Sequence, residues 1–432
     1  MQNRLVIISF FVSFILVSSA EGQKLVNSPY SRFNIGTINP AGSFRSLSMG
    51  GTGIALTGNN TIYFNNPASY SSFDTTSFIF DFGLDYSIID LSNGVSTYSS
   101  DDMNFNHLLM GFPVARGWGV AMGVIPVTNG YYNLSQVVGV GDPGYDPLTG
   151  TVTSYHKGTG GYTQIFLGTG LHITKNLSAG ANMTILFGDI DRTNQYEFED
   201  YASSFNQIST EKLRINGINF DYGLQYSAYL KKDFFLTAGL SVTAAKKYRS
   251  ALEELNIRSA IYASPPYSPD TLSYVNSESR DSTKLPATLR FGLSFGKKDK
   301  FVASIDYVFS SWSKARIFGS EASLVNTKSL MTGIEFIPNK FSNSSYLSTI
   351  EYRIGAHLAN NYFLINGSQI REYGFSCGLG LSMRYAVSKT NLYFDFTRRK
   401  GDLSKGLHNE NIYSIGVSLN LYDWWFRKRK YE

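Results

Sequence analysis

The sequence predicts an all-β protein, a transmembrane antiparallel up-and-down β-barrel of about 14 strands with an N-terminal plug. Three observations predict this fold. Apolar residues alternate with small or polar residues in many segments of the chain. The links between these segments are alternately short and long. The 432 residues are also rich in aromatic residues (15%) and poor in charged ones (16%). Short turns at one end and long loops at the other are typical of bacterial outer-membrane barrels.

The first 20 residues have the pattern of a secretory signal peptide. Arg4 supplies the positive charge, the apolar run from Leu5 to Val17 is too short to span a bilayer, and Ser18 to Ala20 are small. We therefore expect the exported chain to begin near Glu21.

Residues 21–75 do not alternate and are predicted to form an N-terminal periplasmic hatch, which plugs the barrel. They contain two motifs, a Gly-rich run and an Asn-Pro-Ala triplet. The motif residues are Gly50, Gly51, Gly53, Asn66, Pro67 and Ala68. A phosphate-binding loop is the weaker alternative, because no Lys-Ser/Thr pair follows the glycines. Glycine instead allows close approach of backbone to backbone, which a packed plug requires.

The barrel is expected over residues 76–426. In its last strand, Tyr413, Ile415 and Val417 are apolar, whereas Ser414 between them is polar. One face of such a strand suits lipid and the other suits the lumen. The predicted strands are 76–88, 104–115, 117–127, 161–174, 176–188, 214–230, 234–246, 284–296, 300–310, 328–338, 346–358, 371–386, 390–398 and 411–423.

The long links are expected at about 128–160, 189–213 and 247–283. Because the short turns of such barrels face the periplasm, we expect an outer-membrane location with both termini periplasmic. Residues 427–432 would then form a basic periplasmic tail. The strands of a soluble β-sandwich also alternate apolar and polar residues, but the links between them are not alternately short and long.

Charged residues at inward positions are the candidate site residues in the lumen. They are Arg290, Asp306, Glu351, Arg353, His357 and Asp395. Salt bridges across the lumen or to the plug are the favoured interpretation. Arg290 and Arg353 are alternatively placed to bind the carboxylate of a ligand.

The sequence gives no indication of an enzyme. The five His residues form no metal-binding pair. An outer-membrane lipase stays open as a less favoured alternative. We expect no cofactor and no metal, and the net charge of +5 gives no reason to expect nucleic-acid binding.

The run FRSLSMGGTGIALTGNNTIYFNNPASYSS, residues 44–72, resembles the hatch of the FadL-type outer-membrane transporters of hydrophobic compounds. That family has a fourteen-stranded barrel plugged by an N-terminal hatch. The run NSPYSRFNIG (27–36) and the ending WFRKRK (425–430) resemble the Bacteroidetes branch of this OmpP1/FadL/PorV-like family. That branch includes PorV-like components of protein secretion systems.

The resemblance implies two alternative functions. The first is passive uptake of hydrophobic compounds such as long-chain fatty acids, with lateral exit near the third strand, where Pro126 would mark the window. The second is a non-transporting barrel that is a subunit of an outer-membrane protein secretion or assembly machine. The expected partners are outer-membrane lipid and either a hydrophobic ligand or a protein. An open window and an apolar lumen would favour uptake, whereas a blocked lumen with a large outer contact face would favour the machine subunit.

Overall fold

The computed structural model of the chain describes residues 28–198, 205–230, 233–259, 270–319, 323–342, 344–383 and 388–424. The predicted signal peptide and the predicted basic tail both lie outside the described residues. Among the described residues, no helix has the length and apolar character needed to cross a membrane.

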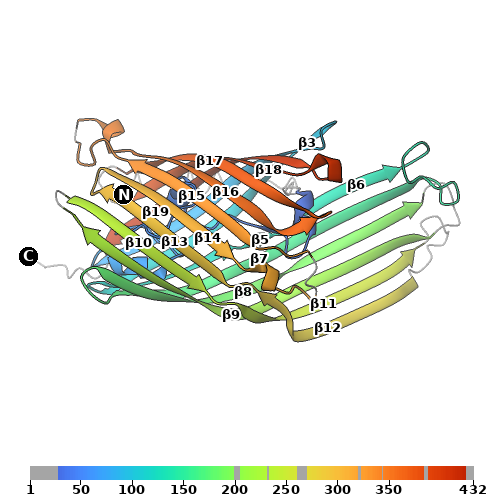
Figure 1. Ribbon diagram of the computed structural model, residues 1–432, viewed down its shortest axis with the longest axis horizontal. Helices are drawn as coiled ribbons and strands as arrows, with labels where there is room; N and C mark the ends of the chain where they lie inside the picture. Colours follow the sequence, from blue (N-terminus) through green and yellow to red (C-terminus); the bar gives the residue numbers. More distant parts are fainter. Residues whose placement is uncertain are drawn as a thin grey trace, which may run out of the picture.

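The strands form one closed antiparallel barrel (Figure 1). The barrel strands are β2 (Ser77–Ser92), β3 (Thr97–Ala115), β4 (Trp118–Pro126), β6 (Tyr132–Val138), β7 (Val152–His172), β8 (Leu177–Phe198), β9 (Asn206–Tyr229), β10 (Phe234–Thr243), β11 (Lys246–Ser259), β12 (Asp270–Leu285), β13 (Thr288–Lys297), β14 (Phe301–Ser310), β15 (Thr327–Phe336), β16 (Glu351–Ile365), β17 (Ser368–Ser382), β18 (Lys389–Lys400) and β19 (Asn409–Trp424). Three of the barrel's strands are each interrupted and appear as two consecutive segments: β4 with β6, β10 with β11, and β12 with β13. When each such pair is counted as one strand, the barrel has 14 strands. The predicted fold class is confirmed.

The barrel reverses the usual distribution of polar and apolar residues. On β9, Phe220 and Tyr222 are 41% and 55% exposed, whereas Gln225 on the opposite face is only 3% exposed. The strand is apolar outside because its solvent there is lipid, and polar inside because it packs against a polar lumen. The last strand pairs with the first, with Tyr413 opposite Ile88, so this seam of the barrel leaves no unpaired edge in the lipid.

The prediction of long loops at about 128–160, 189–213 and 247–283 is largely wrong. Residues 132–138, 152–160, 189–198, 206–213 and 246–285 contain or extend strands, apart from the undescribed residues among them. We call the outer parts of β6, β7, β8, β9, β11 and β12 the outer sheet, and Figure 1 shows it projecting beyond the rest of the barrel. The prediction failed because this sheet extends beyond the apolar belt, so its residues lack the apolar alternation that marks a lipid-facing strand.

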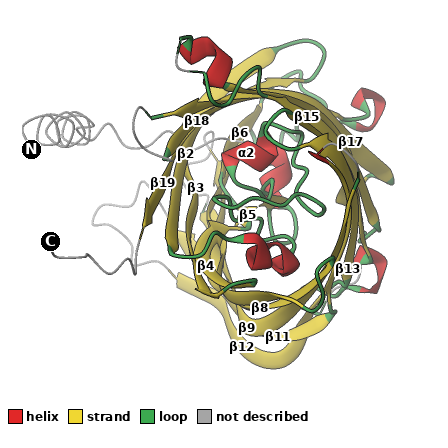
Figure 2. Ribbon diagram, turned by 90° about the vertical axis from the view of Figure 1, so that its left-hand side faces the viewer, coloured by secondary structure: helices red, strands yellow, loops and turns green. Residues whose placement is uncertain are grey.

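Residues 28–76, which we call the internal segment, lie inside the barrel (Figure 2). The segment contains η1 (Pro29–Arg32), β1 (Thr37–Ile38), α2 (Phe44–Leu47) and η2 (Pro67–Ser72). Strand β1 pairs with β5 (Thr128–Asn129), which lies between β4 and β6. Outside the internal segment, the described residues also form the short helices η4 (Trp312–Lys314), η5 (Tyr346–Thr349) and η6 (Leu403–Lys405).

The two ends of the described chain lie at opposite ends of the barrel. Ser28 Oγ donates a hydrogen bond to Glu410 Oε1 (2.6 Å), next to the link between β18 and β19 at the outer end. The last described strand, β19, ends at the side of the short turns. The internal segment therefore runs through the lumen from the outer end to the short-turn end before β2 begins.

Candidate functional site

Wall glycines bring the barrel into direct contact with the internal segment. A Cβ added at Gly239 would lie 2.1 Å from the carbonyl oxygen of Ile54, and one at Gly355 would lie 2.1 Å from the nitrogen of Gly50. A side chain at either wall position would therefore collide with backbone. Small wall residues permit this close approach. The internal segment therefore packs directly against the wall at β10 and β16.

The Gly-rich motif forms a tight turn after α2. Gly50 and Gly51 have φ values of 73° and 90°, which residues with side chains rarely adopt. The amide of Gly50 donates to Ser376 Oγ on β17 (2.9 Å). Gly53 N and Ile54 N both donate to Asp306 Oδ2 on β14, at 2.7 and 2.9 Å. The turn is thus attached to two wall strands.

The Asn-Pro-Ala motif caps a short helix and ties it to the wall. Asn66 is fully buried, and its Oδ1 accepts from Ala68 N (3.2 Å). Its Nδ2 donates to the carbonyls of Ile54 (2.7 Å) and Leu224 (3.2 Å). Pro67 begins η2, where its missing N–H costs nothing. The motif therefore has a structural part in the packing of the internal segment.

A buried charge network joins the internal segment to three wall strands. Arg45 of α2 contacts Glu335 through Nη2–Oε1 (2.6 Å) and Nε–Oε2 (2.9 Å). Arg353 Nε donates to the same Glu335 (2.7 Å) and also pairs with Glu351, which binds Lys389. Burial of this many charges is tolerated only when each is paired. Removal of one partner from such a pair is strongly destabilising.

Tyr63 packs against this network from within the internal segment. The guanidinium carbon of Arg45 lies 5.9 Å from the centre of its ring. Burial raises the pKa of Tyr63 to about 12, so its hydroxyl stays neutral at physiological pH.

A second charge cluster holds the outer start of the internal segment. Arg399 Nε donates to Glu372 (2.7 Å), and its Nη1 donates to Glu410 (3.1 Å), the acceptor of the Ser28 hydroxyl. His357 lies 3.9 Å from both Glu372 and Asp395. These groups lie on β16, β17, β18 and β19.

Four of the six lumen residues named from the sequence line one cavity, namely Arg290, Asp306, His357 and Asp395, whereas Glu351 and Arg353 do not. Glu351 and Arg353 belong to the buried network, Asp306 binds the Gly-rich turn, and His357 and Asp395 belong to the outer cluster. The sequence interpretation did not select Arg45 or Lys389. Arg45 lies outside any predicted strand, so no alternation could have placed it opposite Glu335.

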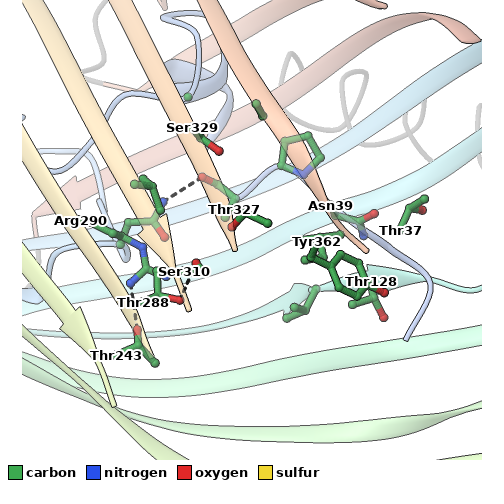
Figure 3. Close-up of a pocket in the computed structure, with 18 of the residues that line it drawn as sticks. Thr37, Asn39, Thr128, Thr243, Thr288, Arg290, Ser310, Thr327, Ser329 and Tyr362 are labelled. Carbon is green, nitrogen blue, oxygen red and sulfur yellow. Dashed lines mark hydrogen bonds between the residues drawn. The ribbon is translucent and has the colours of Figure 1, made fainter. Parts of the chain in front are cut away.

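Arg290 borders a cavity of about 450 Å³ between the internal segment and the wall (Figure 3). Its Nη1 donates to Thr243 Oγ1 (2.9 Å), and the hydroxyls of Thr288 and Ser310 lie 2.8 Å apart beside it. Among the described residues, no carboxylate lies within ion-pair distance of Arg290. Ile35, Tyr162, Trp312 and Tyr362 give the cavity an apolar part, whereas Asp306, His357 and Asp395 add charged groups to its lining. The cavity is therefore amphipathic.

The barrel wall is interrupted at Pro126. The ladder between β3 and β4 ends where Leu108 faces Val124, and beyond it β4 pairs only with β7 as far as Pro126. Farther out, β3 pairs with β2 and β6 pairs with β7, and no ladder joins β3 to β6. The side chain of Asn39 donates to the carbonyl of Pro126 (3.4 Å). A second cavity of about 470 Å³ borders this break.

Comparisons with known proteins identify the family of the chain and solved structures with a similar fold. The BamG family model matches residues 1–432. No curated protein matches the chain. Its fold is similar to that of the CymD monoaromatic hydrocarbon channel, with a TM-score of 0.58, 13% identity, and coverage of 91% of this chain and 100% of that one.

Two further solved structures have a similar fold. The toluene transporter TbuX of Ralstonia pickettii has a TM-score of 0.56 and 14% identity, with 88% of this chain and 98% of that chain covered. A FadL homologue of Pseudomonas aeruginosa has a TM-score of 0.58 and 10% identity, with 88% and 99% covered. At these identities the similarity shows the fold alone.

Proposed function

The chain belongs to the BamG family, and from this premise we propose that it is an outer-membrane barrel that acts as a subunit of a protein secretion or assembly machine. The observation that carries the proposal is the attachment of the internal segment to the wall of the lumen. The internal segment contacts wall glycines directly and is joined to the wall by buried charges. We propose that this segment is the hatch that the sequence predicts.

Passage along the barrel axis would require this hatch to leave. That movement would separate Arg45 from Glu335 and expose several buried charges, which costs about 3 to 5 kcal/mol for even one broken pair. A barrel whose internal segment is attached in this way is suited to binding at its outer face and at its lipid-facing wall. The outer sheet supplies such a face, and the name of the family, BamG, is consistent with a protein partner.

The cavity and the break at Pro126 favour a second candidate function, the passive uptake of hydrophobic compounds such as long-chain fatty acids. A volume of about 450 Å³ is within the range of small-molecule sites. Arg290 would bind the carboxylate, and the apolar side of the cavity would hold the chain. The segment from Thr37 to Asn39 lines both cavities, so its displacement would join them and give lateral exit.

Depletion of the protein from its own bacterium distinguishes the two functions. For a machine subunit, we expect the amount of heat-modifiable, folded outer-membrane barrels to fall, while uptake of radiolabelled oleate per remaining cell stays unchanged. A loss of oleate uptake with normal levels of folded barrels would overturn the first function and support the second.

A further inference from the structure

We infer that the edge of β6 that faces the break in the wall is a docking site for an extended segment of a partner protein, which would add a strand to the outer sheet. This inference rests on the proposed function as a machine subunit and names its contact surface. In this inference the break binds a protein segment, whereas in lateral exit a small ligand would pass through the break.

The strand ladders define this edge. Within the part of the chain that the structure describes, β6 pairs with β7 from Tyr132 opposite Gly158 to Val138 opposite Val152, and with no other strand. Across the break, β3 pairs with β2 alone from Phe105 outward. Figure 1 shows the outer ends of β3 and β6 diverging. The outer sheet is therefore an open sheet with one edge at β6.

The residues that direct their backbone groups into the break can be deduced from a residue that directs its backbone groups toward β7. The carbonyl of Gln136 accepts from the hydroxyl of Ser154 on β7 (3.2 Å), so Gln136 directs its backbone groups toward β7. Both backbone groups of a residue point to one side of a strand, and the side alternates. Ser135 and Val137 therefore direct their N–H and C=O groups into the break.

This edge lacks the usual protection against strand addition. Natural edges carry Lys, Pro or inward charges that prevent pairing with other chains. The run from Tyr131 to Gly141 has no charged residue and no proline, and Val137 is 58% exposed. On the opposing strand, by contrast, the amide of Met103 already donates to Asp102 Oδ1 (2.8 Å).

The same broken strand already receives an added strand within this chain. Thr37 and Ile38 of β1 pair with Asn129 and Thr128 of β5. Strand β6 begins three residues after β5 and continues the same chain outward. A peptide supplies the alternating donors and acceptors that such an edge bonds, whereas an acyl chain supplies none. Asp85 borders the adjoining cavity and, among the described residues, has no Lys or Arg within ion-pair distance, which favours a partner segment that carries a basic residue.

The test compares Ser135→Pro with Ser135→Ala in the full-length tagged protein, in its own bacterium. Proline removes an N–H that faces the break and leaves the bonds to β7, whereas alanine keeps that N–H. After gentle detergent extraction, we expect a stoichiometric protein partner with the wild type and Ser135→Ala, and at least tenfold less of it with Ser135→Pro. Heat-modifiability checks that each variant is folded.

Hydrogen exchange gives a second measurement that does not depend on a variant. In the wild-type complex, the amides of 135 and 137 should exchange at least tenfold more slowly than in the isolated barrel. Full partner recovery with folded Ser135→Pro, or unchanged exchange at these amides, would overturn the docking edge and leave the proposed function intact. Absence of a protein partner from every sample would overturn both, and protection by bound lipid or by a second copy of this chain would overturn the docking edge.

Discussion

Substitution of Arg45 by methionine should release the internal segment from the wall. Arg45 makes two charge-assisted hydrogen bonds to Glu335, at 2.6 and 2.9 Å, and a third to Thr61 (3.1 Å). Loss of one partner of a buried ion pair costs about 3 to 5 kcal/mol. Because Glu335 keeps its bond to Arg353, we expect the lower end, about 3 kcal/mol.

Hydrogen exchange of the purified barrel in detergent measures this loss locally. If residues 44–58 open as a unit, about 3 kcal/mol corresponds to roughly 100-fold faster exchange there. The conservative Arg45→Lys should fall between the wild type and Arg45→Met. In a double-mutant cycle, adding Glu335→Gln to Arg45→Met should cost less than Glu335→Gln costs alone, because the partner is already gone. Equal exchange of residues 44–58 in the wild type and Arg45→Met would show that the contact between Arg45 and Glu335 does not hold the internal segment to the wall.

Three further predictions follow from the same contacts. Gly239→Ala places a Cβ against the carbonyl of Ile54 and should destabilise the barrel by about 1 to 3 kcal/mol in urea unfolding; an unchanged midpoint would contradict the contact. Asn66→Ala removes a cap and two hydrogen bonds to buried carbonyls and should cost about 2 to 3 kcal/mol in the same assay, and less than about 0.5 kcal/mol would contradict its packing role. If the cavity binds fatty acids, Arg290→Met should weaken oleate binding about tenfold in calorimetry without altering exchange at residues 44–58. Unchanged oleate affinity would show that Arg290 does not bind the carboxylate of the fatty acid.

The lipid-facing strands could be predicted from the sequence because lipid imposes a simple rule on them. On the last strand, alternation predicts Tyr413, Ile415 and Val417 on the lipid face, and they are 36%, 57% and 46% exposed in the structure. The same rule cannot find the outer sheet, because both faces of that sheet lie beyond the lipid. Strand β6 is an example, since three of its four exposed residues, Asn133, Ser135 and Gln136, are polar.

The charge contacts could be predicted only in part. Glu351 and Arg353 are two residues apart on one strand, so alternation places both inside, and they do pair. Their further partners, Glu335 and Lys389, come from other strands, and a single sequence does not fix which inward charges meet. The contact of Arg45 could not be predicted from the sequence at all, because the position of Arg45 depends on how the internal segment packs in the lumen.

Native mass spectrometry of the tagged protein, extracted gently from its own outer membrane, tests the central claim most directly. The proposed function predicts a stoichiometric protein partner and a barrel without a bound small molecule. A stoichiometric fatty acid or similar lipid on a barrel without any protein partner would contradict the machine-subunit function and would make the amphipathic cavity beside Arg290 the functional site.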